Sequence, residues 1–423
     1  MKRVLMIIHG SFGDLLPFVW LGKLLRNRGH VVTLLSTPNF SDHVKQAGLE
    51  FWPQEDSLKK ELDAHQGMSS GVQAFFVTSS RAGRTAEECL RSVDGWVEKN
   101  GLPDLLVSQK FCFSAWMLRE KWRRPLLTVH LFPFMIRSLA EPPVVLPALR
   151  HLRRMPAGVR RLVLSALDVF DRLSLSSLRP VCEARGIKMP RKVEREWTHS
   201  PDGSLAFFPE WFAAPQDDWP RNLLQWDFPL EDGANHGVLQ PELENFLASG
   251  EKPVVFSAGS GNNRAQRFFH TAVQLVRALR CRAVFISTTT DQLPADLPAE
   301  IFTTSYVPFG AFLPRCRAYV HHGGIGTTSQ CFAAGIPQMI VPITFDQPDN
   351  ADRMERLGVG AFLNTPRFNF ERALPLLRRC LEDPEIRAEA QKLALRLKQK
   401  KDTGDLLTWI EARSYCGGEG KAS

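Results

Sequence analysis

The sequence predicts an α/β protein made of two doubly wound, Rossmann-like halves. Short apolar runs alternate with helical segments along both halves of the chain. Each half opens with a continuous apolar run that ends in a glycine-containing loop, at 4–13 and again at 253–261. The 423 residues exceed what a single hydrophobic core usually serves, which favours two domains.

The N-terminal half opens with a predicted strand at 4–9, because an unbroken apolar run is typical of a strand covered on both faces. A polar loop follows, and a helix is expected from Pro17, a residue favoured at the first helical position, to Leu25. Gly29 ends this helix. Further strands are expected at 30–36, 102–109, 125–132, 205–208 and 223–228.

The C-terminal half is expected to begin near residue 233, where the composition becomes polar. Its predicted strands at 253–257, 282–288 and 301–307 precede a short strand, 318–320, that ends in two histidines. Glycines 323, 324 and 326 come next, and a helix follows through Ala334. Because the first N–H groups of a helix are unpaired and its dipole is positive there, this turn predicts an anion site. Another strand, 339–341, leads to a loop with Asp346, Gln347 and Asn350 at the same sheet edge.

Composition and charge argue against a membrane-spanning, a secreted or a nucleic-acid-binding protein. The apolar share of 44% is typical of a globular protein, and no run of eighteen apolar residues suggests a membrane span. The N-terminal residues resemble a strand and a loop rather than a secretion signal. The eight cysteines form no CxxC pair and no metal-ligand cluster, which indicates reduced, buried thiols of a cytoplasmic protein. The net charge of +8 suits phosphate-bearing substrates but is too diffuse to indicate nucleic acid.

The glycine turn lacks both GxGxxG spacing and a GK[ST] ending, which counts against dinucleotide and P-loop sites. Its pattern His322-x-Gly324-x-x-Thr327, followed one strand–helix unit later by Asp346-Gln347, resembles the donor signature of the UDP-glycosyltransferase-like family. The resemblance implies the GT-B architecture, in which two such domains face each other across a cleft. It implies an acceptor domain at 1–232, a nucleotide-sugar domain at 233–400, and a C-terminal helix with a flexible tail, 401–423, that crosses back to the first domain.

The resemblance also assigns roles to residues. It places the donor diphosphate at Ser260, His322, Gly324, Gly326, Thr327 and Thr328. The transferred sugar is expected at Asp346 and Gln347, and the nucleobase at Tyr306 and Val307, where relatives carry a tryptophan segment. Because Tyr306 departs from that pattern, dTDP- and UDP-sugars both stay open as donors.

The loop Gly10-Ser11-Phe12-Gly13-Asp14 resembles the family's catalytic loop, which implies that Asp14 is the general base. Apolar residues that would line the acceptor site are Phe111, Trp116, Phe132 and Phe134. The family needs no metal and no cofactor beyond the nucleotide sugar, and the sequence has no DxD motif.

Four segments, 10–18, 197–233, 307–316 and 345–358, are similar to the bacterial rhamnosyltransferases of rhamnolipid synthesis. This narrower resemblance implies inverting transfer of L-rhamnose from dTDP-rhamnose to a hydroxyl of an amphipathic, hydroxyalkanoyloxyalkanoate-like lipid. The alternatives are a UDP-glucose-dependent enzyme acting on a sterol or polyketide-like acceptor, a sugar-nucleotide epimerase, and a non-catalytic, nucleotide-sugar-binding partner subunit.

One stretch, 142–167, contains five arginines and no acidic residue. Leucines and valines are interleaved with the arginines, as in helices that lie on anionic membranes. The pattern predicts peripheral contact with the inner membrane or a membrane-bound partner, or an entrance for the acceptor. A surface helix that packs its apolar stripe on its own domain is the other interpretation.

Overall fold

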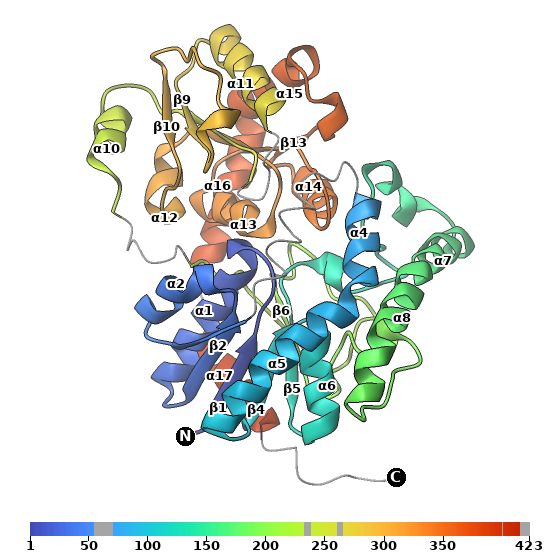
Figure 1. Ribbon diagram of the computed structural model, residues 1–423. Coiled ribbons are helices and arrows are strands. Elements are labelled where there is room, and N and C mark those ends of the chain that lie inside the picture. Colours follow the sequence, from blue (N-terminus) through green and yellow to red (C-terminus); the bar gives the residue numbers. More distant parts are fainter. Residues whose placement is uncertain (55–70, 232–237, 260–264, 400, 415–423) are drawn as a thin grey trace.

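The computed structural model of the chain describes residues 1–54, 71–231, 238–259, 265–399 and 401–414. Two parallel sheets, each covered by helices on both faces, form the two halves of the molecule (Figure 1). The predicted fold class, two Rossmann-like α/β domains, is confirmed.

The N-terminal sheet has seven parallel strands in the order β3-β2-β1-β4-β5-β6-β7. They are β1 Arg3–Ile7, β2 Val31–Ser36, β3 Glu50–Pro53, β4 Leu105–Gln109, β5 Leu126–His130, β6 Ser204–Phe207 and β7 Leu223–Trp226. The helices of this half are α1 Phe12–Asn27, α2 Ser41–Gln46, α4 Gly71–Ser80, α5 Ala82–Asn100, α6 Phe113–Trp122, α7 Ala157–Ala166, α8 Asp168–Ala184 and α9 Val193–Glu196. Short 3-10 turns lie at Pro38–Phe40, Pro133–Met135, Pro147–Leu149 and Leu152–Arg154.

The C-terminal sheet has six parallel strands in the order β10-β9-β8-β11-β12-β13. They are β8 Val254–Ser257, β9 Ala283–Ile286, β10 Ile301–Thr304, β11 Ala318–His321, β12 Gln338–Ile340 and β13 Gly360–Phe362. Its helices are α10 Pro241–Ala248, α11 Gln266–Leu279, α12 Phe309–Phe312, α13 Ile325–Ala334, α14 Gln347–Arg356, α15 Phe370–Glu382 and α16 Pro384–Lys398. Short 3-10 turns lie at Thr290–Gln292, Leu313–Arg315 and Thr365–Arg367.

Strand order reverses once in each sheet, between β1 and β4 and between β8 and β11. Loops that leave such a switch point diverge to opposite faces, which opens a crevice at the carboxyl ends of the strands. The loop before α1 and the glycine turn before α13 both start at these crevices. The predicted catalytic and phosphate-binding segments therefore lie where ligands bind in sheets of this kind.

Aromatic side chains join the two halves. Phe332 of α13 is 1% exposed, and its ring centroid lies 5.3 Å from that of Trp211 and 5.8 Å from that of Phe212. Phe228 also stacks on Phe332, with the two ring centroids 6.1 Å apart. One continuous hydrophobic core holds these rings together with β1, α1 and parts of α14 and α16. The two halves therefore share one hydrophobic core at this contact.

A buried ion network lies beside this aromatic contact. Arg353 of α14 is 3% exposed, and its Nε lies 2.8 Å from Asp349 Oδ2. Across the interface, Glu141 Oε2 is 3.2 Å from Arg353 Nη1, and Val144 N donates to Asp349 at 2.9 Å. The acidic face of α14 thus holds the segment that follows β5 in the N-terminal half.

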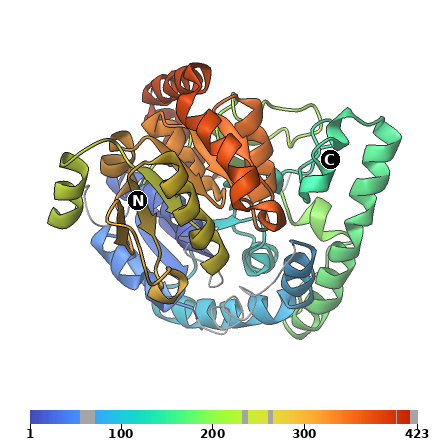
Figure 2. The same cartoon turned by 90° about the horizontal axis from the view of Figure 1, so that it is seen from above.

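The arginine-rich stretch, 142–167, has residues that contact the C-terminal half and others that are exposed to solvent. Arg150 pairs with Asp352 and Glu355 of α14, and Arg153 lies 3.8 Å from Asp352. These cations therefore contact the C-terminal half. Further along, α7 keeps Leu164 buried but exposes 72% of Leu162. Figure 2 shows this helix with α8 at the rim of the molecule, green, beyond the C-terminal half.

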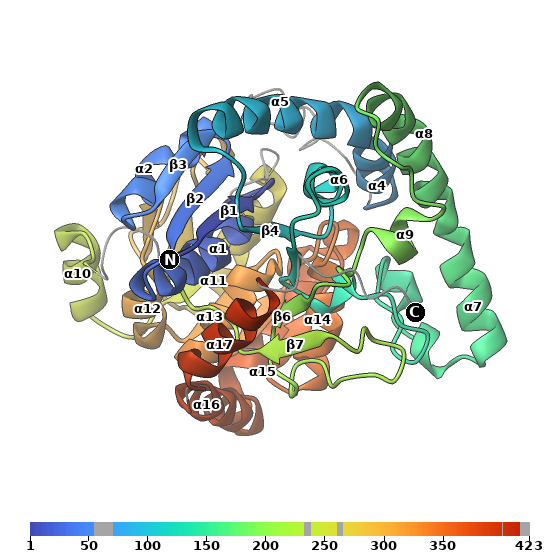
Figure 3. The ribbon, with the colours of Figure 1, turned by 90° about the horizontal axis from the view of Figure 1, so that it is seen from below.

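The last described helix, α17 Thr403–Arg413, lies on the N-terminal sheet, next to α1 in the view from below (Figure 3). Its buried face, Leu406, Leu407 and Ile410, joins the same core as α1. Glu411 binds His30 Nε2 at 3.0 Å and Arg28 Nε at 3.3 Å. The chain thus returns to its first half after completing the second.

Helix α1 begins one and a half turns earlier than predicted, and Pro17 lies inside it. The reason is a capping box, in which Asp14 accepts a hydrogen bond from the N-cap residue Ser11.

Within the described residues, no helix is long and apolar enough to cross a membrane.

Replacing Arg353 with methionine should destabilise the protein by about 3–5 kcal/mol, because Asp349 and Glu141 would lose a cation that they share in a buried site. Chemical denaturation measures the change. Lys392→Met is the matched control, since Lys392 forms an exposed pair with Glu389, and it should cost at most about 1 kcal/mol. Equal midpoints for both variants would contradict the role of this network.

Candidate active site

The glycine turn between β11 and α13 presents free backbone donors. Gly324 is the N-cap of α13, and the first backbone bond of the helix runs from Thr328 N to Gly324 O at 3.0 Å. The N–H groups of Ile325, Gly326 and Thr327 precede that bond and have no partner within the helix. Three convergent donors at the positive end of a helix dipole favour a phosphate group.

Two glycines enclose His322. A Cβ on Gly259 would lie 2.9 Å from the ring, and a Cβ on Gly324 would lie 2.7 Å from Nε2. Only glycine at both positions leaves space for the imidazole. Burial lowers the pKa of His322 to about 4, so the ring is neutral at pH 7. Its Nδ1 is buried without a hydrogen-bond partner among the described residues, and is therefore available for a ligand.

The neighbouring His321 has a structural role. It is fully buried, its Nε2 lies 3.0 Å from Gln338 Oε1, and its Nδ1 accepts from Gly323 N at 3.1 Å. Burial, with a smaller contribution from His322, lowers the pKa of His321 to about 3. The neutral ring therefore fixes the path of the glycine turn through its hydrogen bond with Gly323 N.

A loop after β12 carries the predicted sugar residues. Asp346 is the N-cap of α14 and accepts from Asn350 Nδ2 at 2.6 Å. Asn350 also donates to Gly323 O at 2.9 Å, so one buried amide ties this loop to the glycine turn. The side-chain oxygen of Gln347 accepts from the backbone N–H groups of Ile343 and Thr344, at 2.8 and 3.1 Å. Its amide nitrogen is the end that remains to face a ligand.

Backbone strain accompanies this loop. Phe345 has a φ of 55°, a conformation that is uncommon for a residue with a side chain. Such a conformation costs on the order of 1–3 kcal/mol and is often found beside binding sites. The hydrogen bonds of Gln347 and Asn350 offset this cost and hold Asp346 in place.

Asp14 lies at the third position of α1. Its carboxylate accepts from Ser11 N at 2.8 Å and from Ser11 Oγ at 3.0 Å. A Cβ on Gly10, which has a φ of 123°, would lie 2.4 Å from Asp14 Oδ2, so this turn requires glycine. Burial raises the pKa of Asp14, and the two bonds from Ser11 oppose the shift. Asp14 is therefore a stronger base than an exposed aspartate.

The loop before α1 and the glycine turn before α13 meet across the interface. A Cβ on Gly326 of α13 would be 3.8 Å from Gly13 Cα, so the loops approach each other without side chains between them. Asp14 and Asp346 influence each other electrostatically: burial and then the negative charge of Asp14 raise the pKa of Asp346 to about 7. The structure thus gathers Asp14, His322, Asp346 and the α13 N-terminus into one site.

Other predicted residues have different surroundings. Thr327 lies in the first turn of α13, whereas Thr328 is fully buried and its hydroxyl donates to Gly324 O at 3.0 Å. Tyr306 is 44% exposed, and Val307 packs in the core beneath it. Ser260 lies outside the described residues. The roles assigned to all of these residues stay predictions.

The predicted acceptor residues are mostly buried. Trp116 of α6 is 1% exposed and packs in one core with residues of α5 and the sheet. Phe132 and Phe134 are 9% and 8% exposed and follow β5 at the carboxyl edge of the sheet. Phe111 is half-buried at the same edge. The last three are at the correct edge for an acceptor, and their function stays a prediction.

The sequence placed Gly10, Gly259 and Asn350 in the predicted loops of the site, but it did not show that the two glycines leave space for other side chains or that Asn350 ties two loops together. The spacing Asp346-x-x-x-Asn350 was a usable signal, because residues four apart at a helix start share one face. Nothing in the sequence shows that a Cβ at Gly10 would displace Asp14.

Comparisons with known proteins agree with this fold. The profile for the C-terminal domain of proteins like erythromycin biosynthesis protein CIII matches residues 282–400. O-mycaminosyltylonolide 6-deoxyallosyltransferase of Streptomyces fradiae is 27% identical over 411 residues, which cover 92% of each chain. The fold is shared with the glycotransferase of kitacinnamycin, with a TM-score of 0.72, 21% identity, and 97% and 99% of the two chains covered. It is also shared with the spinosyn rhamnosyltransferase SpnG complexed with thymidine diphosphate, with a TM-score of 0.68, 19% identity, and 97% and 100% covered.

The chain is a GT-B glycosyltransferase. It transfers a sugar from a nucleotide-sugar donor. The predictions of an enzyme and of the GT-B architecture are therefore confirmed.

Replacing Gly324 with alanine should weaken binding of a nucleoside diphosphate to this glycosyltransferase by at least about tenfold, because the new methyl group would displace His322 from its place. His322→Ala should weaken it by about 1.5–3 kcal/mol, the usual range for a hydrogen bond to a charged group. Calorimetry measures both. Gly158→Ala in α7, where a Cβ would meet nothing within 4 Å, is the control. Unchanged affinity in folded Gly324→Ala and His322→Ala variants would refute the assignment.

Asp346 should make stability depend on pH. In the folded glycosyltransferase this carboxyl keeps its proton up to about pH 7, whereas an unfolded aspartate releases it near pH 4. Between these values the folded state binds more protons, so the contribution of Asp346 to stability falls as pH rises, by up to roughly 1.4 kcal/mol per unit. Denaturation midpoints of wild type and Asp346→Asn should therefore diverge between pH 5 and 7. Parallel curves would show that Asp346 does not titrate in this range, and the exposed Asp42→Asn variant serves as the control.

Proposed function

We propose that this glycosyltransferase transfers L-rhamnose, with inversion, from dTDP-rhamnose to a hydroxyl of an amphipathic lipid acceptor that carries an acidic group. The donor class is supported by the spinosyn rhamnosyltransferase SpnG, which shares the fold and has been solved with thymidine diphosphate. The exposed ring of Tyr306 offers a stacking surface for a pyrimidine base.

In the proposed mechanism, the acceptor hydroxyl attacks the anomeric carbon from the face opposite the diphosphate. Asp14 accepts the hydroxyl proton, and its raised pKa improves its strength as a base. The diphosphate leaves toward the N–H groups at the start of α13 and toward His322, where its negative charge is stabilised. Asp346 and the amide nitrogen of Gln347 hold the sugar hydroxyls. The mechanism includes no metal ion.

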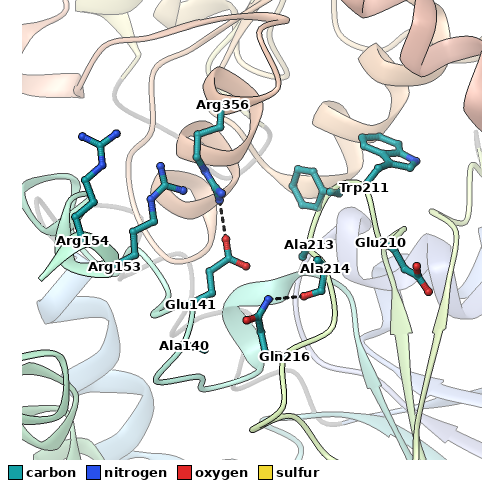
Figure 4. A pocket seen from close by; sticks show the side chains of 11 residues that line it. Ala140, Glu141, Arg153, Arg154, Glu210, Trp211, Ala213, Ala214, Gln216 and Arg356 are labelled. Atoms are coloured by element: carbon teal, nitrogen blue, oxygen red, sulfur yellow. Dashed lines mark hydrogen bonds and ion pairs between the residues drawn. The ribbon is translucent and has the colours of Figure 1, made fainter. Parts of the chain in front are cut away.

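The observation that supports the acceptor proposal is a cavity of about 540 Å³ where the two halves meet, at the end of α14 opposite to Asp346; Asp14, His322 and Asp346 do not line it. Arg153, Arg154 and Arg356 line it opposite Trp211, and the carboxylates of Glu141 and Glu210 also line it (Figure 4). Arg356 is paired with Glu141 at 2.9 Å, whereas the exposed Arg154 has no partner given by the structure among the described residues. Guanidinium groups facing an aromatic wall suit a molecule with an acidic end and an apolar body.

A second candidate acceptor is a macrolide or another polyketide. It is favoured by the relative from Streptomyces fradiae, whose name describes a transferase acting on O-mycaminosyltylonolide. An uncharged polyketide would make no use of Arg154. The two candidates therefore differ in what the arginine contributes.

Replacing Asp14 with asparagine should lower kcat by roughly 10²–10⁴-fold, the usual contribution of a positioned base, while donor affinity stays unchanged. Asparagine retains the oxygen that accepts from Ser11, so the start of α1 is preserved. Single-turnover kinetics isolate the chemical step, and Asp42→Asn is the surface control. Near-normal single-turnover rates in Asp14→Asn would assign the base elsewhere.

Replacing Arg154 with glutamine should raise the KM for a hydroxyalkanoyloxyalkanoate acceptor by about tenfold and leave the KM for dTDP-rhamnose unchanged, because one charge-assisted contact is lost. Arg161→Gln removes the same charge from α7 outside the cavity and should leave both constants unchanged. Products are identified by mass spectrometry with a panel of dTDP- and UDP-sugars. Transfer to macrolides and sterols, without transfer to the acidic lipid, would replace this proposal with the second candidate.

Peripheral contact with the inner membrane stays a prediction. The face of α7 that exposes Val159 and Leu162 beside Arg161 is the part of the arginine-rich stretch that would make it.

A further inference from the structure

A histidine and two cysteines lie together in the N-terminal half, outside the site described above. His9, Cys89 and Cys112 are all buried, and each offers one ligand atom within 4.8 Å of the other two. His9 follows β1, Cys89 lies in α5, and Cys112 is the N-cap of α6 directly after β4. The three residues thus meet at the switch point between β1 and β4. The sequence predicted no metal-ligand cluster because they are 80 and 23 positions apart.

This ligand set has the chemistry of a zinc site. Thiolate and imidazole are the groups that Zn²⁺ prefers, at about 2.3 and 2.0 Å in a tetrahedral arrangement. Such an arrangement places ligand atoms roughly 3.5–3.8 Å apart, which the three atoms reach with shifts of less than about 1 Å. Two thiolates, one neutral imidazole and one dication sum to zero charge. A neutral complex suits this site, because Cys89 and Cys112 are both fully buried.

A second observation concerns the residue that orients His9. Gln54 is 1% exposed, and its amide nitrogen, Nε2, lies 2.9 Å from His9 Nδ1. The other end of that amide, Oε1, is buried without a hydrogen-bond partner among the described residues. Exchanging the two ends of the amide lets Oε1 accept from a protonated Nδ1. The same exchange leaves Nε2 of His9 with a free lone pair, as a metal ligand requires.

Other neighbours support the sulfur atoms and the histidine backbone. The hydroxyl oxygen of Ser114 lies 3.0 Å from Cys89 Sγ and 3.1 Å from Cys112 Sγ. Gln109 donates to the carbonyl of His9. These hydrogen bonds hold the ligand-bearing segments in position, as outer-shell partners do around metals.

We propose that His9, Cys89 and Cys112 bind one Zn²⁺ ion. Binding releases the two thiol protons, and a water molecule takes the fourth position. The ion ties β1, α5 and α6 together directly beneath the loop that carries Asp14. It has a structural role and takes no part in sugar transfer.

The test is metal analysis of the full-length protein, purified without chelator and then reconstituted with ZnCl₂ and dialysed. Wild type should retain about one zinc per chain, and Cys89→Ser and Cys112→Ser should each lose at least about 90% of it. Cys182→Ser is the matched control, because Cys182 is fully buried in the same core layer but lies outside the cluster. It should retain zinc like the wild type. Cobalt in place of zinc should give thiolate-to-metal charge-transfer absorption in the wild type and in Cys182→Ser. The Cys89→Ser and Cys112→Ser variants should lack this absorption.

A second measurement needs no variant. Alkylation of the wild type, followed by peptide mass spectrometry, should show that zinc protects Cys89 and Cys112 and leaves the reactivity of the other cysteines unchanged. Absence of zinc after reconstitution, protection of other cysteines instead, or a Cys89–Cys112 disulfide in the purified protein would each overturn the proposal. Nucleoside diphosphate binding by the C-terminal half should be unaffected by zinc removal.

Discussion

The active site depends on the aromatic contact between the two halves. Neither sheet contains the whole site: Asp14 comes from the first, and His322 and Asp346 come from the second. Phe332 is inserted among Trp211, Phe212 and Phe228, and this contact sets the separation of the two halves. Because protein interiors are closely packed, a shift of even one methylene group in this contact would be transmitted to the loops. Gly13 and Gly326 can meet only at that separation.

Electrostatics within the site follow from burial rather than from added charge. His322 is neutral, Asp346 has a pKa of about 7, and the pKa of Asp14 is raised. A site with few fixed charges has a low cost of desolvation, and the negative charge that develops on a leaving diphosphate meets backbone dipoles. The charges of Arg353, Asp349 and Glu141 instead lie at the interface, where they hold the halves together.

Much of the fold was predictable because parallel strands that are covered on both faces consist of continuous apolar runs. The start of α1 was not, because Pro17 is a strong local signal and the capping bond from Ser11 to Asp14 is visible only in the structure. The donor residues were found through local motifs. The partners of Arg150 and Arg153, the burial of Trp116 and the meeting of His9 with two cysteines depend on tertiary packing, which local patterns do not contain.

The return of α17 to the N-terminal sheet limits how the molecule can open. The chain passes between the halves twice, once between β7 and α10 and once between α16 and α17. Two connections define a line, and rotation about that line is the motion that leaves both of them intact. Rotation about this line would separate most the site edge that is farthest from the two connections.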